Sequence, residues 1–440
     1  MTEFTPFTFR EALAEQKGIP SEADFAPKVF TSAKREFSSH DKKITYELLS
    51  SDQAVVLDQM VSEITSGRFM HSPYVTLGGY AGTGKSTLIP LIAERLGRVR
   101  NTAFCSFTGK ASNVLKRKLE VAGIKPSDAG YIGTMHGLMY LPVLDERGLI
   151  VKWESKETLC GADGATPIKR IIVDEASMVG SRLLEDLQSY HIPIVLVGDH
   201  GQLEPVMDES VVARPDFRLE KIHRQAAENP IIQLSQIIRQ KGAIPGNFKE
   251  SEQIRFISKK ELGRLAGQKF DELGLDMGLL VRSNKRRCAF NETAVKGSVP
   301  RVGDILICLR NNPPIFNGMR GLLEEIEEVG AHWFRVTIHF PDDGFRLKTI
   351  INRHQFNRTK TIESIYDLYK DYGYPRACQD MGLLFDFGMA LTVHKAQGSA
   401  FEEAILCPEY WPSFDDEGDG YKRWLYTGVT RAAKTLYILR

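Results

Sequence analysis

Short apolar runs and amphipathic stretches alternate along most of this chain. An amphipathic helix is predicted to begin near Asp52, and apolar, β-rich runs separated by helical stretches follow it. Such runs are typical of buried parallel strands, and their alternation with helices is typical of βαβ units. The predicted strands are residues 73–77, 101–107, 170–173 and 192–197, then 278–281, 387–393, 404–407 and 435–439. The pattern therefore predicts an α/β fold with two domains in tandem.

Two segments interrupt this alternation. Residues 141–154 have apolar flanks around a D-E-R-G turn, which predicts a β-hairpin. Residues 301–340 contain several short strand-like runs punctuated by Gly and Pro, which we interpret as a small barrel inserted into the second domain. Residues 1–48 are polar with broken periodicity, and we interpret them as an arm or a small accessory segment.

Composition limits the class of protein but not its function. A chain of 440 residues is too long to fold around one ordinary hydrophobic core, so we expect two or more domains. A content of 42% apolar and 26% charged residues is typical of a globular protein. The net charge of +1 neither demands nor excludes nucleic acid, because a phosphate-binding groove needs only a local basic lining. We expect no membrane span, no secretory signal and no zinc site, and reduced cysteines. The expected location is the cytoplasm of a bacterium or of a phage-infected host.

A phosphate-binding loop is predicted at residues 79–86, which read G-Y-A-G-T-G-K-S and fit G-x-x-x-x-G-K-[ST]. The loop follows a predicted strand and opens a predicted helix, the context that gives this pattern its mechanism. Backbone N–H groups would surround the phosphates, and the helix N-terminus would add positive potential. Lys85 would contact the β- and γ-phosphates, and the Ser86 hydroxyl would hold Mg²⁺. The strand–helix context disfavours the alternative, a glycine-rich turn without a ligand.

Carboxylates and an amide follow the next predicted strands. Asp174 and Glu175 end the run at 170–173, and ligands bind at the carboxyl ends of strands in such sheets. Asp174 would orient the magnesium shell, and Glu175 would activate the attacking water. Gln202 follows the run at 192–197 and could sense the γ-phosphate or this water. In isolation each could be a solvated strand end; together with the loop they predict nucleotide hydrolysis.

The remaining motifs resemble, in order, those of superfamily 1 helicases. One motif reads T-V-H-K-A-Q-G, and this form resembles the motif of the RecD/Dda-like branch more closely than that of RNA-directed relatives. The resembling segments are Gln53, Phe107-Thr108-Gly109-Lys110-Ala111-Ser112, Thr134-Met135-His136-Gly137, Asp174-Glu175-Ala176-Ser177-Met178, Gly198-Asp199-x-x-Gln202-Leu203, residues 219–225 with Arg224, Asn284, residues 392–398, and residues 425–432 with Arg431.

The resemblance implies an architecture. It is that of two tandem RecA-like P-loop domains, with a β-hairpin insertion in the first and a small SH3-like β-barrel insertion in the second. The expected parts are an arm at 1–48, the first domain at 49–214 with its insertion at 138–166, the second domain at 215–300 and 385–440, and the barrel insertion at 301–384. The comparison supplies no role for the arm.

The resemblance also implies the residues of an ATP and Mg²⁺ site. Arg224 and Arg431 would lie on the second domain and reach the phosphate; surface salt bridges are the alternative for each. The implied catalytic residues are Lys85, Asp174, Glu175, Gln202, Arg224 and Arg431. The implied nucleotide-binding residues are Gln53, Gly79, Ala81, Gly82, Thr83, Gly84, Lys85, Ser86, Thr87, Gly398 and Glu402, with Ser86 and Asp174 at the metal.

A third set of residues would bind DNA. The resemblance implies Phe107, Thr108, Gly109, Lys110, Thr134, His136, Asn284, Thr392, His394 and Lys395. His136 and His394 could instead be buried histidines. Phe107, Tyr140 and Trp153 could stack on bases or pack in the core, and Trp153 would lie on the hairpin that separates the duplex. The basic clusters at 116–118 and 285–287 are interpreted as solvated faces.

The sequence thus predicts an ATP-dependent DNA helicase, with 5′→3′ movement implied by the resemblance alone. A single-strand translocase that displaces bound proteins and an RNA helicase of the same superfamily share these motifs and stay open. An inactive nucleotide-binding adaptor would lack Glu175, an arginine or Gln202, and all are present. The expected partners are single-stranded and forked DNA, with single-strand-binding, replication or recombination proteins as further candidates, and we expect a monomer.

Overall fold

The computed structural model divides into two compact units. One takes its residues from Met1–Phe37, Leu144–Val151 and Lys259–Thr392, and the other from Ser38–Val143, Lys152–Ser258 and Val393–Arg440. The structure describes residues 28–31, 45–67, 69, 72–97, 99–144, 150–205, 210–222, 228–295, 299–312, 315–373, 381–409 and 419–440. Among these residues no helix is both long and apolar enough to cross a membrane.

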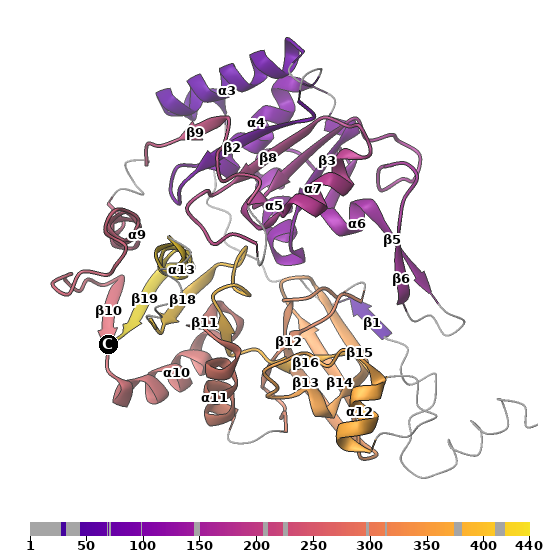
Figure 1. The fold of residues 1–440 in the computed structure, drawn as a ribbon, viewed down its shortest axis with the longest axis vertical. Helices are drawn as coiled ribbons and strands as arrows, with labels where there is room; N and C mark the ends of the chain where they lie inside the picture. The colour runs from indigo at the N-terminus through magenta and orange to yellow at the C-terminus, as the bar shows by residue number, and fades with distance from the viewer. Residues whose placement is uncertain are drawn as a thin grey trace, which may run out of the picture. The chain divides into compact units, whose positions relative to one another are not determined.

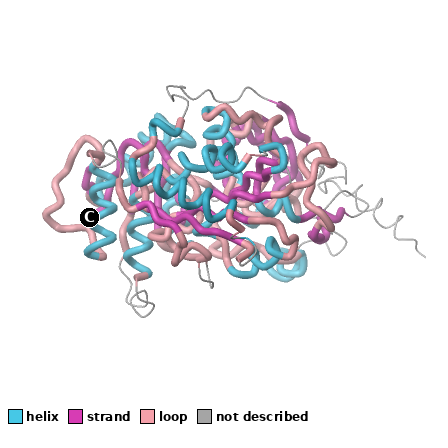
Figure 2. The backbone as a smooth tube through the Cα atoms, turned by 90° about the horizontal axis from the view of Figure 1, so that it is seen from above, coloured by secondary structure: helices cyan, strands magenta, loops and turns pink. Residues whose placement is uncertain are grey.

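The larger unit alternates strands with helices along its sequence; Figure 2 draws the helices of the chain in cyan and its strands in magenta. Its helices are η1 (Tyr46–Leu48), α3 (Ser51–Thr65), α4 (Lys85–Leu96), η3 (Val99–Asn101), α5 (Gly109–Val121), α6 (Met135–Met139), η4 (Ala176–Met178), α7 (Ser181–Gln188), α9 (Pro230–Lys241) and α13 (Gly420–Val429). Its strands are β2 (Tyr74–Gly79), β3 (Thr102–Ser106), β4 (Tyr131–Thr134), β7 (Arg170–Asp174), β8 (Ile194–Gly198), β9 (Phe217–Leu219), β10 (Ile254–Ile257), β18 (Phe401–Leu406) and β19 (Ala432–Leu439). The helix predicted near Asp52 and the predicted strands of this unit are thereby confirmed.

A six-stranded parallel sheet forms the first core, in the order β4-β3-β7-β8-β2-β9. Neighbouring residues of a strand point to opposite faces, and both faces of this sheet are covered. Phe104, Ile172 and Val195 pack with residues of α3, α4 and α5, whereas Cys105 and Ile171 pack with residues of α6 and α7. Coverage on both faces explains why these strands are uninterrupted apolar runs. Figure 1 shows this sheet with α3 and α4 beside it.

The edge strand β9 differs from the sequence prediction. It pairs with β2 in the first sheet, although residue 215 was expected to begin the second domain. Asp216 anchors this segment, because its carboxylate accepts hydrogen bonds from the Thr76 N–H at 2.9 Å and the Thr76 hydroxyl at 2.7 Å. A strand of three residues is too short to show a pattern, so the sequence does not predict that residues 217–219 join the first sheet.

The C-terminal part of the same unit contains a second group of parallel strands. β19 pairs in parallel with β10 on one side and with β18 on the other. Leu436 and Ile438 of β19 are buried, and the helix α13 ends directly before this strand. The prediction of a two-part α/β fold with parallel sheets is therefore confirmed.

The smaller unit is dominated by antiparallel strands. Its helices are α10 (Lys259–Leu273), η5 (Gly274–Asp276), α11 (Asn284–Val295), η6 (Arg353–Gln355) and α12 (Ile365–Tyr372). Its strands are β1 (Lys28–Thr31), β11 (Met277–Val281), β12 (Ile305–Cys308), β13 (Arg320–Val329), β14 (Trp333–Phe340), β15 (Phe345–Asn352), β16 (Phe385–Phe387) and β17 (Ala390–Thr392). Six of them form a sheet in the order β1-β15-β14-β13-β12-β16, and β11 pairs in parallel with β17.

Two features of this unit differ from the sequence prediction. The single apolar run expected at 387–393 is divided: β16 pairs antiparallel with β12, and β17 pairs with β11. The arm also contributes structure, because β1 pairs antiparallel with β15 at the edge of the six-stranded sheet. Apolar content cannot distinguish one long strand from two short ones that join different sheets.

The segment expected to be a hairpin contains two paired strands. These are β5 (Tyr140–Leu144) and β6 (Ile150–Ser155), which form a two-stranded sheet of their own. Trp153 on β6 is 37% exposed. Residues 145–149, which include the whole D-E-R-G turn, lie outside the described residues.

Candidate functional site

The loop between β2 and α4 is curled by glycines. Gly82 and Gly84 have φ values of 81° and 76°, a left-handed conformation that a side chain disfavours. The Thr83 hydroxyl donates to the Tyr80 carbonyl oxygen at 2.8 Å and closes the turn. Ser86 and Thr87 lie half-buried in the first turn of α4, so the predicted magnesium ligand is at the helix N-terminus. The loop therefore has the form that surrounds a phosphate group.

The side chain of Lys85 turns back over this loop. Its Nζ donates to the Tyr80 carbonyl oxygen at 2.9 Å and lies 3.7 Å from the Asp199 carboxylate. The backbone N–H of Ala81 donates to the Tyr426 hydroxyl oxygen at 2.7 Å. Lys85 thus contacts Asp199, which follows β8. The Ala81 amide contacts Tyr426, which belongs to α13.

Gln53 lies behind the loop. Its side chain is only 3% exposed and forms a capping box with Ser50 at the start of α3. The amide Nε2 donates to the Thr83 carbonyl oxygen at 3.1 Å, and Oε1 accepts from the Ser50 N–H at 3.1 Å. In this structure Gln53, which is expected to bind the nucleotide, supports the phosphate loop.

Asp174 and Glu175 lie at the carboxyl end of β7, where the sequence predicts them. Asp174 is buried and accepts a hydrogen bond from the Glu175 N–H at 2.9 Å. Glu175 has a φ of 56°, which is strained for a residue with a side chain and is found most often at functional sites. Burial and the neighbouring Asp174 raise the pKa of Glu175, while the positive charges of Arg431 and Lys85 oppose this rise. A carboxylate with a raised pKa is suited to accept a proton.

The loop after β8 holds a buried carboxylate and a buried amide. Asp199 is 1% exposed; it accepts from the Tyr426 hydroxyl at 2.7 Å and from the Gly201 N–H at 2.9 Å. Gln202 is 5% exposed, and its Nε2 lies 3.5 Å from the Asp199 carboxylate. The Gln202 Oε1 makes no hydrogen bond with the described residues, so it is available to accept one from a water molecule. Burial lowers the pKa of the intervening His200 to about 4, and this imidazole is neutral at pH 7.

Of the arginines expected at the phosphate, one can be described. Arg431 is buried, and its guanidinium donates to the carbonyl oxygens of Thr427 and Ser399 and to the Thr430 hydroxyl. These bonds hold Arg431 within its own C-terminal segment. Arg224 lies outside the described residues.

Gly398 and Glu402, which are expected to bind the nucleotide, contact residues outside the phosphate loop. Gly398 has a φ of 67°, and a Cβ added there would lie 3.2 Å from the Thr108 hydroxyl oxygen. Glu402 pairs with Lys434 at 2.5 Å. The structure therefore places Gly398 against a residue expected to bind DNA.

Several residues expected to bind DNA stand at helix N-termini. The Thr108 hydroxyl accepts from the Ala111 N–H and caps α5, and the Thr134 hydroxyl accepts from the Gly137 N–H and caps α6. Gly109 begins α5, and the ammonium of Lys110 lies 4.8 Å from the centre of the Phe401 ring. Such helix N-termini attract the phosphate groups of a nucleic acid.

Three aromatic residues lie in a row next to these caps. The rings of Phe107 and His136 are 6.0 Å apart, and those of His136 and Tyr140 are 5.8 Å apart. The Tyr140 hydroxyl donates to the Asp186 carboxylate at 2.6 Å. Burial lowers the pKa of His136, which is therefore neutral at pH 7.

The remaining expected DNA contacts are divided between the units. His394 and Lys395 are half-buried in the larger unit, in the turn after β17. Thr392 ends β17 in the smaller unit and is buried. Asn284 is exposed at the start of α11, and its Oδ1 accepts from the Arg287 Nε at 3.4 Å.

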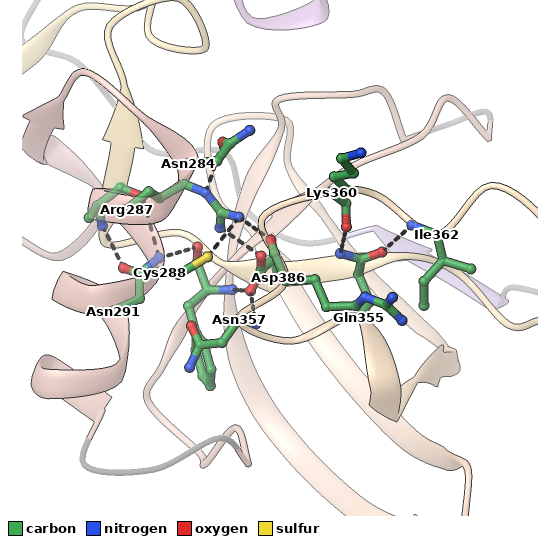
Figure 3. A network of polar contacts seen from close by, with 12 residues as sticks. Asn284, Arg287, Cys288, Asn291, Gln355, Asn357, Lys360, Ile362 and Asp386 are labelled. Atoms are coloured by element: carbon green, nitrogen blue, oxygen red, sulfur yellow. Dashed lines mark hydrogen bonds and ion pairs between the residues drawn. The ribbon is translucent and has the colours of Figure 1, made fainter. Parts of the chain in front are cut away.

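The interpretation of residues 285–287 as a solvated cluster was wrong for Arg287. This guanidinium is buried; it donates to the Asp386 carboxylate at 2.6 Å and to the Arg358 carbonyl oxygen at 2.8 Å (Figure 3). Lys285 and Arg286 are exposed. A run of basic residues on a helix does not reveal which member faces the core, because its partner lies 99 positions away.

Sequence reasoning missed the role of α13 around the phosphate loop. Tyr426 contacts the loop, Thr427 accepts from the Leu203 N–H at 2.9 Å, and Arg423 donates to the carbonyl oxygens of His200 and Gln202. Tyr426 lies inside the same motif as Arg431, so the motif itself was the only available signal.

Two family models match this chain. Residues 49–259 match a model described as an AAA domain, and residues 387–439 match a model described as a UvrD-like helicase C-terminal domain. The first match contains the phosphate loop with Glu175 and Gln202, and the second contains Tyr426 and Arg431.

A curated relative is the ATP-dependent RecD2 DNA helicase of Deinococcus radiodurans, which is 28% identical over 417 residues. The match takes in 87% of this chain and 48% of the relative, so the chain spans about half the length of the curated relative it matches. Among solved structures, Pif1 helicase from Candida albicans is 16% identical with a TM-score of 0.45, covering 89% of this chain and 94% of that one. Pif1 helicase from Bacteroides, in complex with ADP-AlF3 and ssDNA, is 17% identical with a TM-score of 0.43, covering 87% and 92%.

Proposed function

We propose that the chain is an ATP-driven motor of the superfamily 1 helicases, in the RecD-like group, which moves along single-stranded DNA and unwinds duplex DNA; its matches to an AAA domain, to a UvrD-like helicase C-terminal domain and to a RecD2 helicase support this proposal. The observation that carries this proposal is the convergence of three elements in one unit. The phosphate loop, the carboxylate of Asp199 and the C-terminal helix α13 are joined by hydrogen bonds through Tyr426. Coupling of hydrolysis to movement requires a physical link between the nucleotide site and a distant part of the chain, and these hydrogen bonds form such a link.

The residues of the loop fit ATP and Mg²⁺. Left-handed Gly82 and Gly84 leave the backbone N–H groups free of a Cβ on the phosphate side, and α4 begins directly after them. The Ser86 hydroxyl and the Asp174 carboxylate are hard oxygen ligands, which suit Mg²⁺. When bound, the metal would neutralise charge that develops on the phosphates.

We assign the hydrolytic roles to residues of the larger unit. Glu175 accepts a proton from the attacking water, and Gln202 orients that water through its available Oε1. Lys85 leaves the Tyr80 carbonyl oxygen to contact the phosphates. Arg431 and Arg224 stabilise the transition-state charge, a role worth about 10³–10⁵ in rate where an arginine performs it.

DNA would lie along the capped helix N-termini. Thr108 and Thr134 with the first N–H groups of α5 and α6 would bind its phosphates, and the row formed by Phe107, His136 and Tyr140 would face its bases. The finer architecture belongs to the same proposal: RecA-like domains, an SH3-like insertion formed by the antiparallel strands from β12 to β15, and a duplex-separating hairpin formed by β5 and β6.

Unwinding of tailed duplexes tests the proposal. Partial duplexes with a 5′ tail or a 3′ tail are incubated with ATP and the full chain, and Glu175→Gln is the inactive control. We expect ATP-dependent separation of the 5′-tailed substrate alone. Separation of neither substrate, combined with DNA-stimulated ATP hydrolysis, would replace the helicase by a translocase that displaces bound proteins.

The hairpin assignment has its own test. Trp153→Ala removes a ring that is 37% exposed, and denaturant titration of the variant measures any accompanying loss of stability. We expect a marked loss of unwinding, with DNA-stimulated ATP hydrolysis unchanged. Tyr366→Ala, which removes another exposed aromatic ring from α12, is the matched control. Equal loss of both activities in Trp153→Ala would make the hairpin a structural element.

A further inference from the structure

Tyr426 is the residue of α13 that contacts both the phosphate loop and the loop after β8. Its hydroxyl oxygen accepts from the Ala81 N–H at 2.7 Å, and its proton is donated to the Asp199 carboxylate at 2.7 Å. Burial and the charge of Asp199 raise the pKa of this phenol well above its usual value of 10, so the group stays a neutral donor. One hydroxyl therefore links two catalytic loops to the C-terminal motif.

Asp199 connects this hydroxyl to residues with proposed catalytic roles. The oxygen that accepts from Tyr426 also lies 3.7 Å from the Lys85 ammonium and 3.5 Å from the Gln202 amide nitrogen. Removing the hydroxyl would leave Lys85 as the main partner of this carboxylate oxygen. The lysine would then be drawn toward Asp199, and the Gln202 amide would lose a fixed acceptor.

The loop after β8 is held at several further points by the same C-terminal segment. Arg423 donates to the carbonyl oxygens of His200 and Gln202. Leu203 is held on both sides, because its N–H donates to the Thr427 hydroxyl and its carbonyl oxygen accepts from the Gln397 amide at 2.9 Å. These contacts fix the backbone of the loop, whereas among the described residues of this segment Tyr426 alone contacts both the Asp199 carboxylate and the phosphate loop.

We infer that Tyr426 is a positioning residue for ATP hydrolysis, which holds Asp199 so that Lys85 and Gln202 can act in the transition state. Ground-state affinity for the nucleotide is expected to come mainly from the loop N–H groups other than that of Ala81, which donates to the hydroxyl, and from the N-terminus of α4. A group that acts through orientation in the transition state lowers kcat more than it changes binding. This inference rests on the proposed function only in taking the loop as a site of ATP hydrolysis.

The test is Tyr426→Phe in the full chain, which keeps the buried ring and removes the hydroxyl alone. Turnover of ATP is measured with and without single-stranded DNA, and affinity is measured with a non-hydrolysable ATP analogue. We expect kcat to fall on the order of tenfold under both conditions, with the dissociation constant of the analogue changed by less than about threefold. Tyr437→Phe, which removes a buried tyrosine's hydrogen bond to Glu403 on β18, is the matched control and should keep full turnover.

Turnover of Tyr426→Phe within about twofold of the unaltered chain would overturn the inference, as would an equal loss in Tyr437→Phe. A fall in turnover matched by an equal loss of analogue affinity would also overturn it, since the hydroxyl would then only shape the loop. Should Tyr426→Phe not fold, Asp199→Asn keeps the side-chain shape and alters the acceptor of the Tyr426 hydroxyl; an unchanged kcat there would overturn the inference, because the orientation of this carboxylate would then not matter for hydrolysis. ATP hydrolysis that DNA does not stimulate would instead refute the motor, and the DNA-free kcat values would still decide the role of Tyr426.

Discussion

Two buried carboxylates in different units, Asp386 and Asp199, show how similar groups serve different ends. Asp386 is fully buried; one oxygen binds the Arg287 guanidinium at 2.6 Å, and the other accepts the N–H groups of Asn357 and Phe387. Arg287 in turn uses its Nε and both of its terminal nitrogens (Figure 3). Both Asp386 oxygens and three Arg287 nitrogens therefore have partners within the protein.

Asp199 is as deeply buried as Asp386, but its ion pair is longer. Its cation, Lys85, stands at 3.7 Å, and the neighbouring Gln202 has an acceptor that makes no hydrogen bond with the described residues. Glu175 nearby in the same site has a strained backbone and a raised pKa. Strain and incomplete pairing lower stability, so they persist where the chemistry needs them. The two networks differ most clearly in the distance to the cation, which is 2.6 Å between Arg287 and Asp386 and 3.7 Å between Lys85 and Asp199.

The largest effect should come from the reacting network. Glu175→Gln removes the proposed base while keeping the shape of the side chain, and a general base contributes about 10²–10⁴ in rate. We expect kcat for ATP hydrolysis to fall by that amount with nucleotide binding retained. Glu327→Gln, at an exposed ion pair on β13, is the control and should keep full turnover. Substantial residual hydrolysis in Glu175→Gln would show that another group takes the proton.

In the network around Asp386, we expect a substitution to lower the stability of the fold rather than the rate of ATP hydrolysis. Asp386→Ala leaves the buried Arg287 charge unpaired, which costs about 3–5 kcal/mol of unfolding free energy. Denaturant titration measures this loss. Glu327→Ala breaks the exposed pair with Arg335 and should cost less than about 1 kcal/mol. Equal losses in the two variants would mean that the buried pair contributes no more than a surface one.

The smallest effect should be a gain of stability from the inactive variant. A pKa raised above the ordinary 4.5 means that the folded state favours protonated Glu175. The wild-type chain therefore loses stability as pH rises through this raised pKa, whereas glutamine stays neutral. We expect Glu175→Gln to melt at a higher temperature than the wild-type chain at pH 8, with the difference shrinking toward pH 4. A lower melting temperature at pH 8 would contradict the raised pKa.

The sequence was sufficient for the elements that have a strong local pattern. Continuous apolar runs predicted β2, β3, β7 and β8, because a strand covered on both faces has little room for polar residues. The phosphate loop and the carboxylates that end β7 follow from the same local rules. Motif order along the chain then indicated the family.

The sequence does not reveal which distant residues contact one another in the fold. Nothing local shows that β1 would pair with β15, that β9 would join the first sheet, or that Arg287 would meet Asp386. The same holds for Tyr426, whose contact with Ala81 joins residues 345 positions apart. Polar partners brought together by folding leave no periodicity that a pattern could reveal.

The most direct measurement of the central claim is steady-state ATP hydrolysis by the full chain, titrated with single-stranded DNA and with single-stranded RNA of the same sequence. The account predicts saturable stimulation by DNA, weak or no stimulation by RNA, and hydrolysis slowed by about 10²–10⁴ in Glu175→Gln. A rate that DNA leaves unchanged, or that RNA raises more than DNA does, would contradict a DNA motor.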